Sequence, residues 1–181
     1  MEAPHGQARP QAEPIVSATT RAGLQLVLIV TIAATIGCDR VTKRIARERL
    51  AGAPERSFLA GTVRLAYAEN AGGFLSLGED LPAVIRTAVF TIGTGMMLLA
   101  LTALAFRFRG HRWRVIGLTL FAAGGASNWA DRVTEGRVVD FLNVGVGPVR
   151  TGVFNVADVA IMCGVGLLLI AEIGGRREDT A

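Results

Sequence analysis

Apolar residues gather in four long blocks along the chain, at residues 22–38, 83–106, 113–130 and 153–173. Each block holds roughly 17 to 24 residues, which is the length of helix that crosses a bilayer core about 30 Å thick. A helix of a soluble domain would instead show a narrower apolar stripe that returns every three to four residues. The pattern therefore predicts an all-α integral membrane protein with four transmembrane helices.

The connection between the first and second blocks is long and has a pattern of its own. Val41, Ile45 and Leu50 extend a helical stripe beyond the first block. Residues 62–68 then alternate between apolar and polar as a strand does, and residues 71–73 (Ala-Gly-Gly) favour a turn. We expect a helical continuation and then a small β element outside the membrane.

The short connection between the second and third blocks sets the orientation. It carries four arginines and no acidic residue, and the positive-inside rule places such a loop in the cytoplasm. Both termini are then cytoplasmic, and the other two connections are extracytoplasmic. A basic run after the first block disagrees, but the rule gives less weight to that long connection. The run consists of Arg40, Lys43, Arg44, Arg47 and Arg49.

Residues 1–21 are polar and rich in Pro, Ala and Gln, so they predict a disordered N-terminal tail. Residues 22–173 form the predicted four-helix membrane domain, and residues 174–181 form a cytoplasmic C-terminal tail. The chain of 181 residues has the length of one domain.

Composition agrees with a membrane protein and excludes nucleic-acid binding. Hydrophobic residues make up 51% of the chain, charged residues 19%, and the mean hydropathy is +0.43. The net charge of +4 comes from basic residues that flank the apolar blocks, as in membrane proteins generally. The two histidines, His5 and His111, lie in the tail and in the basic loop, which disfavours Ser–His catalysis and a histidine metal site.

Two related tetrapeptides stand at the predicted outer ends of the last two blocks. The third block ends in Asn128-Trp129-Ala130-Asp131, and the fourth begins within Asn155-Val156-Ala157-Asp158. Residues three apart share a helix face, so each segment presents an amide beside a carboxyl. Two neighbouring carboxyls in low dielectric share a proton, and such a pair can activate water and polarise a carbonyl. Asp131 and Asp158 are therefore candidate catalytic residues.

A structural interpretation of the same residues is also open. Asp158 would serve as a cap for the last helix, and Asp131 could pair with Arg132 at the membrane surface. In that case the chain would be a non-catalytic multi-pass protein, for transport or for binding of precursors, with a polar cluster at the outer leaflet.

In its order of motifs the chain resembles the lipoprotein signal peptidase (signal peptidase II) family, over about residues 22 to 173. The matching segments are Asn128-Trp129-Ala130-Asp131-Arg132, Gly136-Arg137-Val138-Val139-Asp140-Phe141 and Phe154-Asn155-Val156-Ala157-Asp158. Two upstream segments, Asp39-Arg40-Val41-Thr42-Lys43 and Asn70-Ala71-Gly72-Gly73, resemble family motifs as well.

The resemblance implies a membrane aspartic endopeptidase of the bacterial cytoplasmic (inner) membrane, with its active site on the extracytoplasmic side. Such an enzyme removes signal peptides from diacylglyceryl-modified prolipoproteins, just before the modified cysteine, in contact with membrane lipid. Asp131 and Asp158 would be the catalytic pair, without metal or cofactor. The fold would add an interfacial helix between spans one and two, and we expect a monomer.

The resemblance also implies residues that bind substrate or shape the site, namely Asn128, Asn155, Asp39, Lys43, Asn70, Gly72, Arg132 and Asp140. Two of these have structural alternatives, because Lys43 could be an interfacial anchor and Asp140 could pair with an arginine. The chain departs from the family pattern at Gly73-Phe74-Leu75, Ser127, Arg40 and Val159, which permits an altered substrate range.

Overall fold

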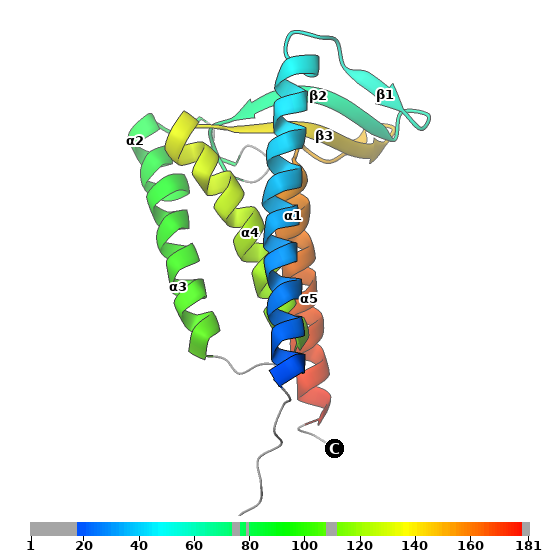
Figure 1. Cartoon of the computed structure of the whole chain (residues 1–181). Coiled ribbons are helices and arrows are strands. Elements are labelled where there is room, and N and C mark those ends of the chain that lie inside the picture. The colour runs from blue at the N-terminus through cyan, green and yellow to red at the C-terminus, as the bar shows by residue number, and fades with distance from the viewer. Residues whose placement is uncertain (1–17, 74–76, 79, 108–111, 179–181) are drawn as a thin grey trace, which may run out of the picture.

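A computed structural model describes residues 18–73, 77–78, 80–107 and 112–178. Long helices stand side by side, and a small sheet lies across one end of them (Figure 1). Most of the predicted N-terminal tail lies outside the described residues.

The four apolar blocks are helical apart from residues 153–155, which precede the last helix. The first lies in α1 (Ala18–Leu50) and the second in a continuous helical rod of α2 (Ala83–Arg86), η2 (Thr87–Gly93) and α3 (Thr94–Arg107). The third and fourth blocks lie in α4 (Arg112–Glu135) and α5 (Val156–Glu178). The first and last helices thus extend into residues that the sequence assigns to the tails, and the division into domains stays a prediction.

Three of the described helices are long and apolar enough to cross a membrane, at Gly23–Leu50, Ala83–Leu101 and Val156–Ile173. Helix α4 has 24 residues, but glycines, Ser127 and Asn128 lower its hydropathy. Its buried residues are small or polar, so its inner face packs against protein.

The helical stripe predicted beyond the first block is the continuation of α1, which runs without a break to Leu50. In the described part of residues 51–82 the chain forms strands and turns. The separate interfacial helix is therefore not confirmed.

The predicted β element is present and is larger than expected. Strands β1 (Arg56–Phe58), β2 (Val63–Asn70), β3 (Val138–Val146) and β4 (Val149–Arg150) form one antiparallel sheet in the order β1-β2-β3-β4. The sequence pattern predicts only the strand at residues 62–68. The central strands, β2 and β3, pair with each other. Strand β2 lies between the first and second apolar blocks and β3 lies between the third and fourth, so the sheet joins these two connections.

Close packing of α4 on α5 depends on glycines. A Cβ atom at Gly124 would lie 2.4 Å from the backbone oxygen of Ala157, and one at Gly164 would lie 2.6 Å from that of Gly117. Small residues of this kind let membrane helices approach closely. At the sheet end, this packing brings Asn128 and Asp131 of α4 near the start of α5.

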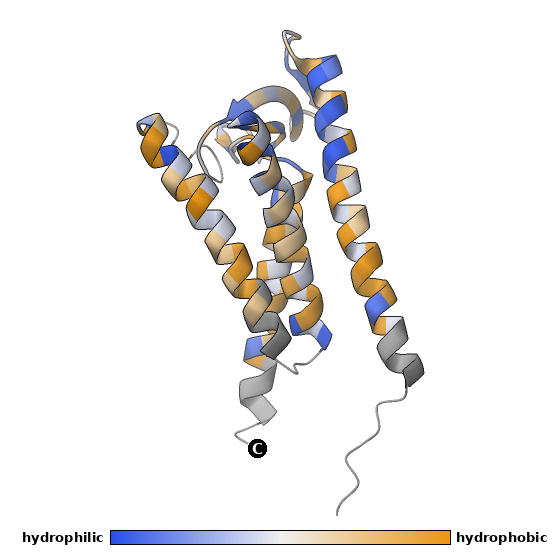
Figure 2. Ribbon diagram, turned by 60° about the vertical axis from the view of Figure 1, so that its left-hand side comes forward, coloured by the Kyte–Doolittle hydropathy of each residue, from blue (hydrophilic) through white to orange (hydrophobic). Residues whose placement is uncertain are grey.

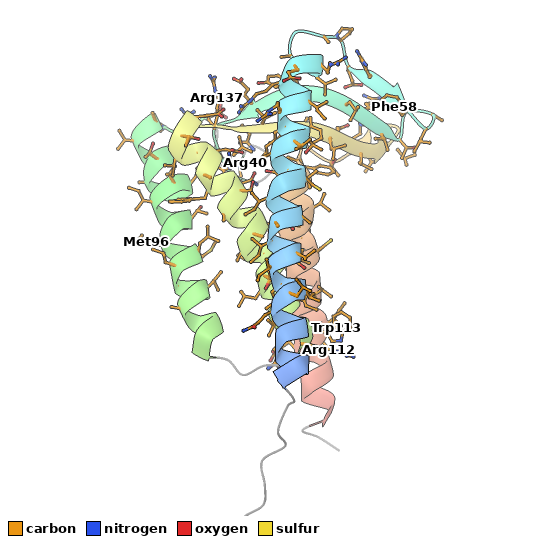
Figure 3. The ribbon with its side chains drawn as sticks, viewed as in Figure 1. Arg40, Phe58, Met96, Arg112, Trp113 and Arg137 are labelled. Carbon is orange, nitrogen blue, oxygen red and sulfur yellow. The ribbon has the colours of Figure 1, made fainter. Side chains whose placement is uncertain are left out.

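Hydrophobic and polar residues are separated along the long axis of the molecule. Figure 2 shows hydrophilic residues gathered at the sheet end and over the adjoining part of α1, with the helices below mostly hydrophobic. Exposed apolar side chains such as Met96 point outward from the helices (Figure 3). The exposed surface of the helices is suited to contact with lipid, and the polar side chains gather at the sheet end of the molecule.

Candidate active site

Lys43 of α1 is the centre of a buried polar cluster. Its side chain is 5% exposed, and Nζ lies 2.7 Å from Asp39 Oδ2, 2.7 Å from Asp131 Oδ2 and 2.7 Å from Asn128 Oδ1. An ammonium group has three donors, and here each has an acceptor. Lys43 therefore belongs to the protein interior, and the interfacial-anchor interpretation is wrong.

Asp39 joins three helices at this point. Its Oδ2 atom accepts a hydrogen bond from Ser127 Oγ at 2.7 Å, and its Oδ1 atom accepts one from the backbone N–H of Ala157 at 2.9 Å. The side chain is fully buried, and both of its oxygens have hydrogen-bond or ion-pair partners. Sequence reasoning noted Ser127 only as a departure from the family pattern and missed its contact with Asp39.

Asp158 caps helix α5 and also contacts α4. The backbone N–H of Asn155 donates to Asp158 Oδ2 at 3.0 Å, and the N–H of Asp158 donates to Asn155 Oδ1 at 3.0 Å. This reciprocal pair satisfies amide groups at the start of the helix. The other carboxyl oxygen, Oδ1, accepts a hydrogen bond from Asn128 Nδ2 at 2.9 Å. The capping role is real, and it leaves Asp158 facing the cluster.

Asn128 lies between the two candidate catalytic residues. Its Oδ1 atom accepts from Lys43 and from Asn155 Nδ2, and its Nδ2 atom donates to Asp158. Asp131 and Asp158 are therefore linked through Lys43 and Asn128. They are 8% and 7% exposed respectively, so both are shielded from bulk water.

Asp140 of β3 accepts amide hydrogen bonds from Asn155 Nδ2 at 2.6 Å and from Asn70 Nδ2 at 3.0 Å. Burial raises the pKa of its carboxyl to about 6, against the lowering effect of the hydrogen bond from Asn70. Its hydrogen-bond partners are amides, and among the residues that the structure describes it forms no ion pair with an arginine, which was the structural alternative.

The turn after β2 completes the cluster. Asn70 Nδ2 also donates to Gly73 O at 2.8 Å, while its Oδ1 atom accepts the backbone N–H of Gly72 at 2.9 Å. The Gly72 oxygen in turn accepts two hydrogen bonds from Arg132, at 2.6 and 3.1 Å. Arg132 thus binds this turn, whereas Asp131 pairs with Lys43 and not with its neighbour in sequence.

The structure brings together all ten residues that the sequence singles out, from α1, β2, α4, β3 and the start of α5 and from the turn after β2. Four of them are buried carboxyls, Asp39, Asp131, Asp140 and Asp158, while Lys43 and Arg132 are the cations. If every carboxyl were ionised, the cluster would carry an uncompensated charge of about −2 in low dielectric, which is unfavourable. Such a cluster favours a retained proton.

A rim of charged side chains lies around the cluster on its sheet side. Arg47 and Glu135 form an ion pair one helical turn beyond Lys43 and Asp131. Tyr67 donates to Glu69, which also accepts from Arg137 at 2.7 Å, and Figure 3 shows Arg137 at the sheet end. The sequence analysis did not single out these residues for the site, although Arg47 and Glu135 lie four residues after Lys43 and Asp131.

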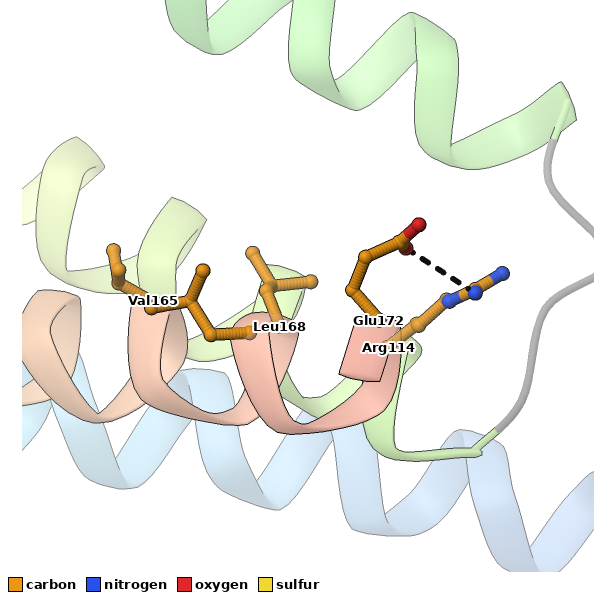
Figure 4. Close-up of a pocket in the computed structure, with 5 residues that line it drawn as sticks. Arg114, Val165, Leu168 and Glu172 are labelled. Carbon is orange, nitrogen blue, oxygen red and sulfur yellow. Dashed lines mark hydrogen bonds and ion pairs between the residues drawn. The ribbon is translucent and has the colours of Figure 1, made fainter. Parts of the chain in front are cut away.

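A shallow hollow lies at the opposite end of α4 and α5 (Figure 4). Apolar residues of α5 line it together with Arg114 and Glu172, which approach each other to 3.3 Å. The polar cluster lies about 17 residues away along α4, or roughly 26 Å at the rise of an α-helix. The hollow is therefore not part of the site.

In the described part of the chain, no group of three or more His, Cys, Asp or Glu side chains has an arrangement that would hold a metal ion. The four buried aspartates are instead bound by amides, a hydroxyl, backbone N–H groups and an ammonium group.

Comparison with known proteins shows the class of protein to which this chain belongs. The sequence profile of the family described as signal peptidase (SPase) II matches residues 31–173. A lipoprotein signal peptidase of Streptococcus pneumoniae is 35% identical over 156 residues, which cover 83% of this chain and 97% of the relative. One from Mycobacterium avium is 30% identical over 190 residues, which cover 99% of this chain and 92% of the relative.

A solved structure of a bacterial membrane enzyme superposes with a TM-score of 0.69 at 25% identity, over 82% of this chain and 88% of that one. Fold, site and relatives define a membrane peptidase. The profile covers most of the chain, and the protein belongs to the signal peptidase II family.

Proposed function

We propose that this membrane lipoprotein signal peptidase is an aspartic endopeptidase with Asp131 and Asp158 as its catalytic pair. The observation that carries the proposal is the buried hydrogen-bonded path from Asp131 through Lys43 and Asn128 to Asp158. The two carboxyls come from neighbouring helices and share one shielded cluster.

The proposed chemistry uses one ionised and one protonated carboxyl. The ionised carboxylate takes a proton from water as the oxygen attacks the scissile carbonyl, and the protonated carboxyl donates to the carbonyl oxygen. Lys43 lies against Asp131, so we assign the ionised state to Asp131 and the protonated state to Asp158. Asp131, which now carries the proton from water, gives it to the leaving nitrogen, and Asp158 takes back the proton of the intermediate's hydroxyl group. The C–N bond then breaks, which releases the new amino terminus and the new carboxyl group.

The remaining cluster residues hold this pair. Asn128 and Asn155 orient the carboxyls and contact the substrate, since both lie directly against Asp158. The other members shape and stabilise the site through the contacts described above, namely Asp39, Lys43, Asn70, Gly72, Arg132 and Asp140.

The proposed substrate is a prolipoprotein whose cysteine carries a diacylglyceryl group, and the cut falls just before that cysteine. The position of the cluster supports this, because it lies where the apolar helices meet the polar sheet (Figure 2). Acyl chains can remain in the membrane there while the peptide reaches the carboxyls. We expect the enzyme to act as a monomer.

We propose four spans in the bacterial cytoplasmic membrane, with α4 as the third span in chain order, in addition to the three helices that are apolar enough by themselves. At 24 residues α4 is roughly 36 Å long, enough to cross a bilayer core. Its polar face turns inward, and at its other end the Arg112 guanidinium lies 5.5 Å from the centre of the Trp113 ring, which suits an interface anchor (Figure 3). Both termini are then cytoplasmic and the site is extracytoplasmic.

The basic run after the first block is compatible with this orientation. Lys43 is neutralised by Asp39 and Asp131, and Arg47 pairs with Glu135. Two of the five charges that argue against the orientation are therefore compensated inside the protein.

A transport role has less support. A polar path would have to continue along the inside of the bundle, but the buried polar residues of the described chain gather at the sheet end. Thr35 is the one nearest the other end of α1, and its position is still only four residues from Asp39.

The test is cleavage of a diacylglyceryl-modified prolipoprotein by the purified chain in lipid vesicles. We expect the wild type to release the signal peptide, and Asp131→Asn and Asp158→Asn each to lower kcat by about 1,000-fold or more, because each removes a group that transfers a proton. Asp80→Asn is the matched control, since Asp80 is exposed in a loop.

A folded wild-type protein that leaves the precursor intact would refute the peptidase proposal. If Asp131→Asn or Asp158→Asn cleaved as fast as Asp80→Asn, the chemistry would belong to other residues.

A further inference from the structure

A π-helical segment interrupts the rod between α2 and α3. Residues Thr87–Gly93 form η2, with regular α-helix on both sides. A π-helix is rare and usually survives as a short insertion at a functional site. Two consecutive residues of this segment, Phe90 and Thr91, contact elements that carry site residues.

Phe90 packs on the turn after β2. A Cβ atom at Gly73 would lie 2.7 Å from Phe90 Cε1, and one at Gly78 would lie 2.9 Å from Phe90 Cζ. A side chain on either glycine would force the ring or the turn to shift. The ring therefore lies directly against the backbone at both places.

The turn under Phe90 holds two site residues directly. Gly73 O accepts from Asn70 Nδ2, which also donates to Asp140. One residue earlier, Gly72 O accepts two hydrogen bonds from Arg132. A shift of the turn would therefore move the partners of Asp140 and Arg132 together.

Thr91 contacts α4, the helix that carries Asp131. Its backbone oxygen accepts a hydrogen bond from Trp129 Nε1 at 2.9 Å, in addition to the backbone N–H of Thr94. Gly95 lies against the same indole, because a Cβ atom there would be 2.8 Å from Nε1. Trp129 stands directly after Asn128 and two residues before Asp131.

We propose that the π-helical segment is a positioning element of the active site. Phe90 is its positioning residue for the turn at Gly72 and Gly73, and the Thr91 oxygen fixes α4 through Trp129. This inference rests on the proposed function, because it concerns the geometry of the proposed catalytic cluster. It assigns a role to the second span, which contributes no residue to the cluster itself.

The test is a double-mutant cycle between Gly73 and Phe90 in the full-length chain. Gly73→Ala adds a methyl group where the ring now lies, and Phe90→Leu removes part of the ring. We expect Gly73→Ala to lower kcat on the order of tenfold with little change in KM, because a displaced turn misorients the site without removing a group. Phe90→Leu alone should lower kcat by about threefold.

The double variant shows whether the contact between Gly73 and Phe90 positions the site. If the contact positions the site, Phe90→Leu makes room for the methyl group, and the combined variant should recover to within about threefold of the wild-type kcat. Gly37→Ala is the matched control, since a Cβ atom at Gly37 would meet nothing within 4 Å. The midpoint of thermal unfolding is measured on the same samples.

If the two substitutions act independently, the loss of kcat in the double variant equals the product of the losses in the two single variants. This result would overturn the positioning role and would leave the peptidase proposal intact. Losses of kcat that follow the unfolding midpoint across all variants, without rescue, would also overturn it. If the wild type and Gly37→Ala both fail to cleave, the proposed function falls and this inference falls with it.

Discussion

Two of the ion pairs that α4 makes, one toward each end of the helix, differ sharply in their surroundings. At one end Arg114 lies 3.3 Å from Glu172, with side chains 41% and 58% exposed (Figure 4). At the other end Lys43 lies 2.7 Å from Asp131, with side chains 5% and 11% exposed. Both pairs join α4 to another helix.

The difference lies in the neighbours of each pair. The exposed pair borders apolar residues of α5, and its charges can be solvated at its end of the bundle. The buried pair is surrounded by three further carboxyls and by amides that orient them. Burial increases the electrostatic interaction and also increases the cost of any missing partner. In a buried polar cluster of this kind, each side chain depends on the partners that the other members supply.

The buried pair should be the most sensitive to substitution. Lys43→Met would leave Asp39 and Asp131 buried without their cation, and loss of one partner of a buried pair costs about 3 to 5 kcal/mol. We expect a lower midpoint of thermal unfolding in detergent and severe loss of cleavage. A variant with wild-type stability would mean that Lys43 is not the counter-ion of the cluster.

Asp140 should make stability depend on pH. Its folded pKa of about 6 lies above the usual value of 3.8, so the folded state binds the proton more tightly than the unfolded state. The stabilising contribution is complete below about pH 4 and is lost as pH rises through 6, by roughly 3 kcal/mol.

Asp140→Asn removes this titration, so its stability should fall less than that of the wild type between pH 4 and pH 7. Unfolding midpoints measured across this range give the comparison. Parallel curves for the two proteins would exclude Asp140 as the source of the pH dependence.

Helix packing beside the cluster should respond to one methyl group. Gly124→Ala would place its Cβ atom 2.4 Å from the Ala157 oxygen, next to Asp158, and overpacking of this kind costs about 1 to 3 kcal/mol. Gly166→Ala on α5 is the control, because nothing lies within 4 Å of the added atom. Equal unfolding midpoints for the two variants would show that α4 and α5 can separate freely.

The exposed pair should give the smallest effect. Arg114→Met leaves Glu172 solvated, and an exposed ion pair contributes about 0 to 1 kcal/mol. We expect cleavage at the wild-type rate and an unfolding midpoint close to that of the wild type. An effect as large as that of Lys43→Met would erase the distinction between the two ends of α4.

The sequence by itself determined the helices and the candidate residues. Long apolar blocks need a helix in a membrane, because each backbone polar group must find a partner within its own segment. The four blocks are helical apart from residues 153–155, and the sequence places Asn128 three residues before Asp131 and Asn155 three residues before Asp158. These features depend on near neighbours in the chain.

Only the tertiary structure decided how those residues meet. The contact from Lys43 to Asp131 spans 88 residues, and so does that from Ser127 to Asp39. The sheet is also larger than its pattern suggested, because β3 is stabilised by pairing with the distant β2. The π-helical contact of Phe90 with Gly73 has no signal in the apolar pattern, which stays apolar throughout that segment. Long-range packing fixes such contacts, and hydrophobic periodicity describes only the local chain.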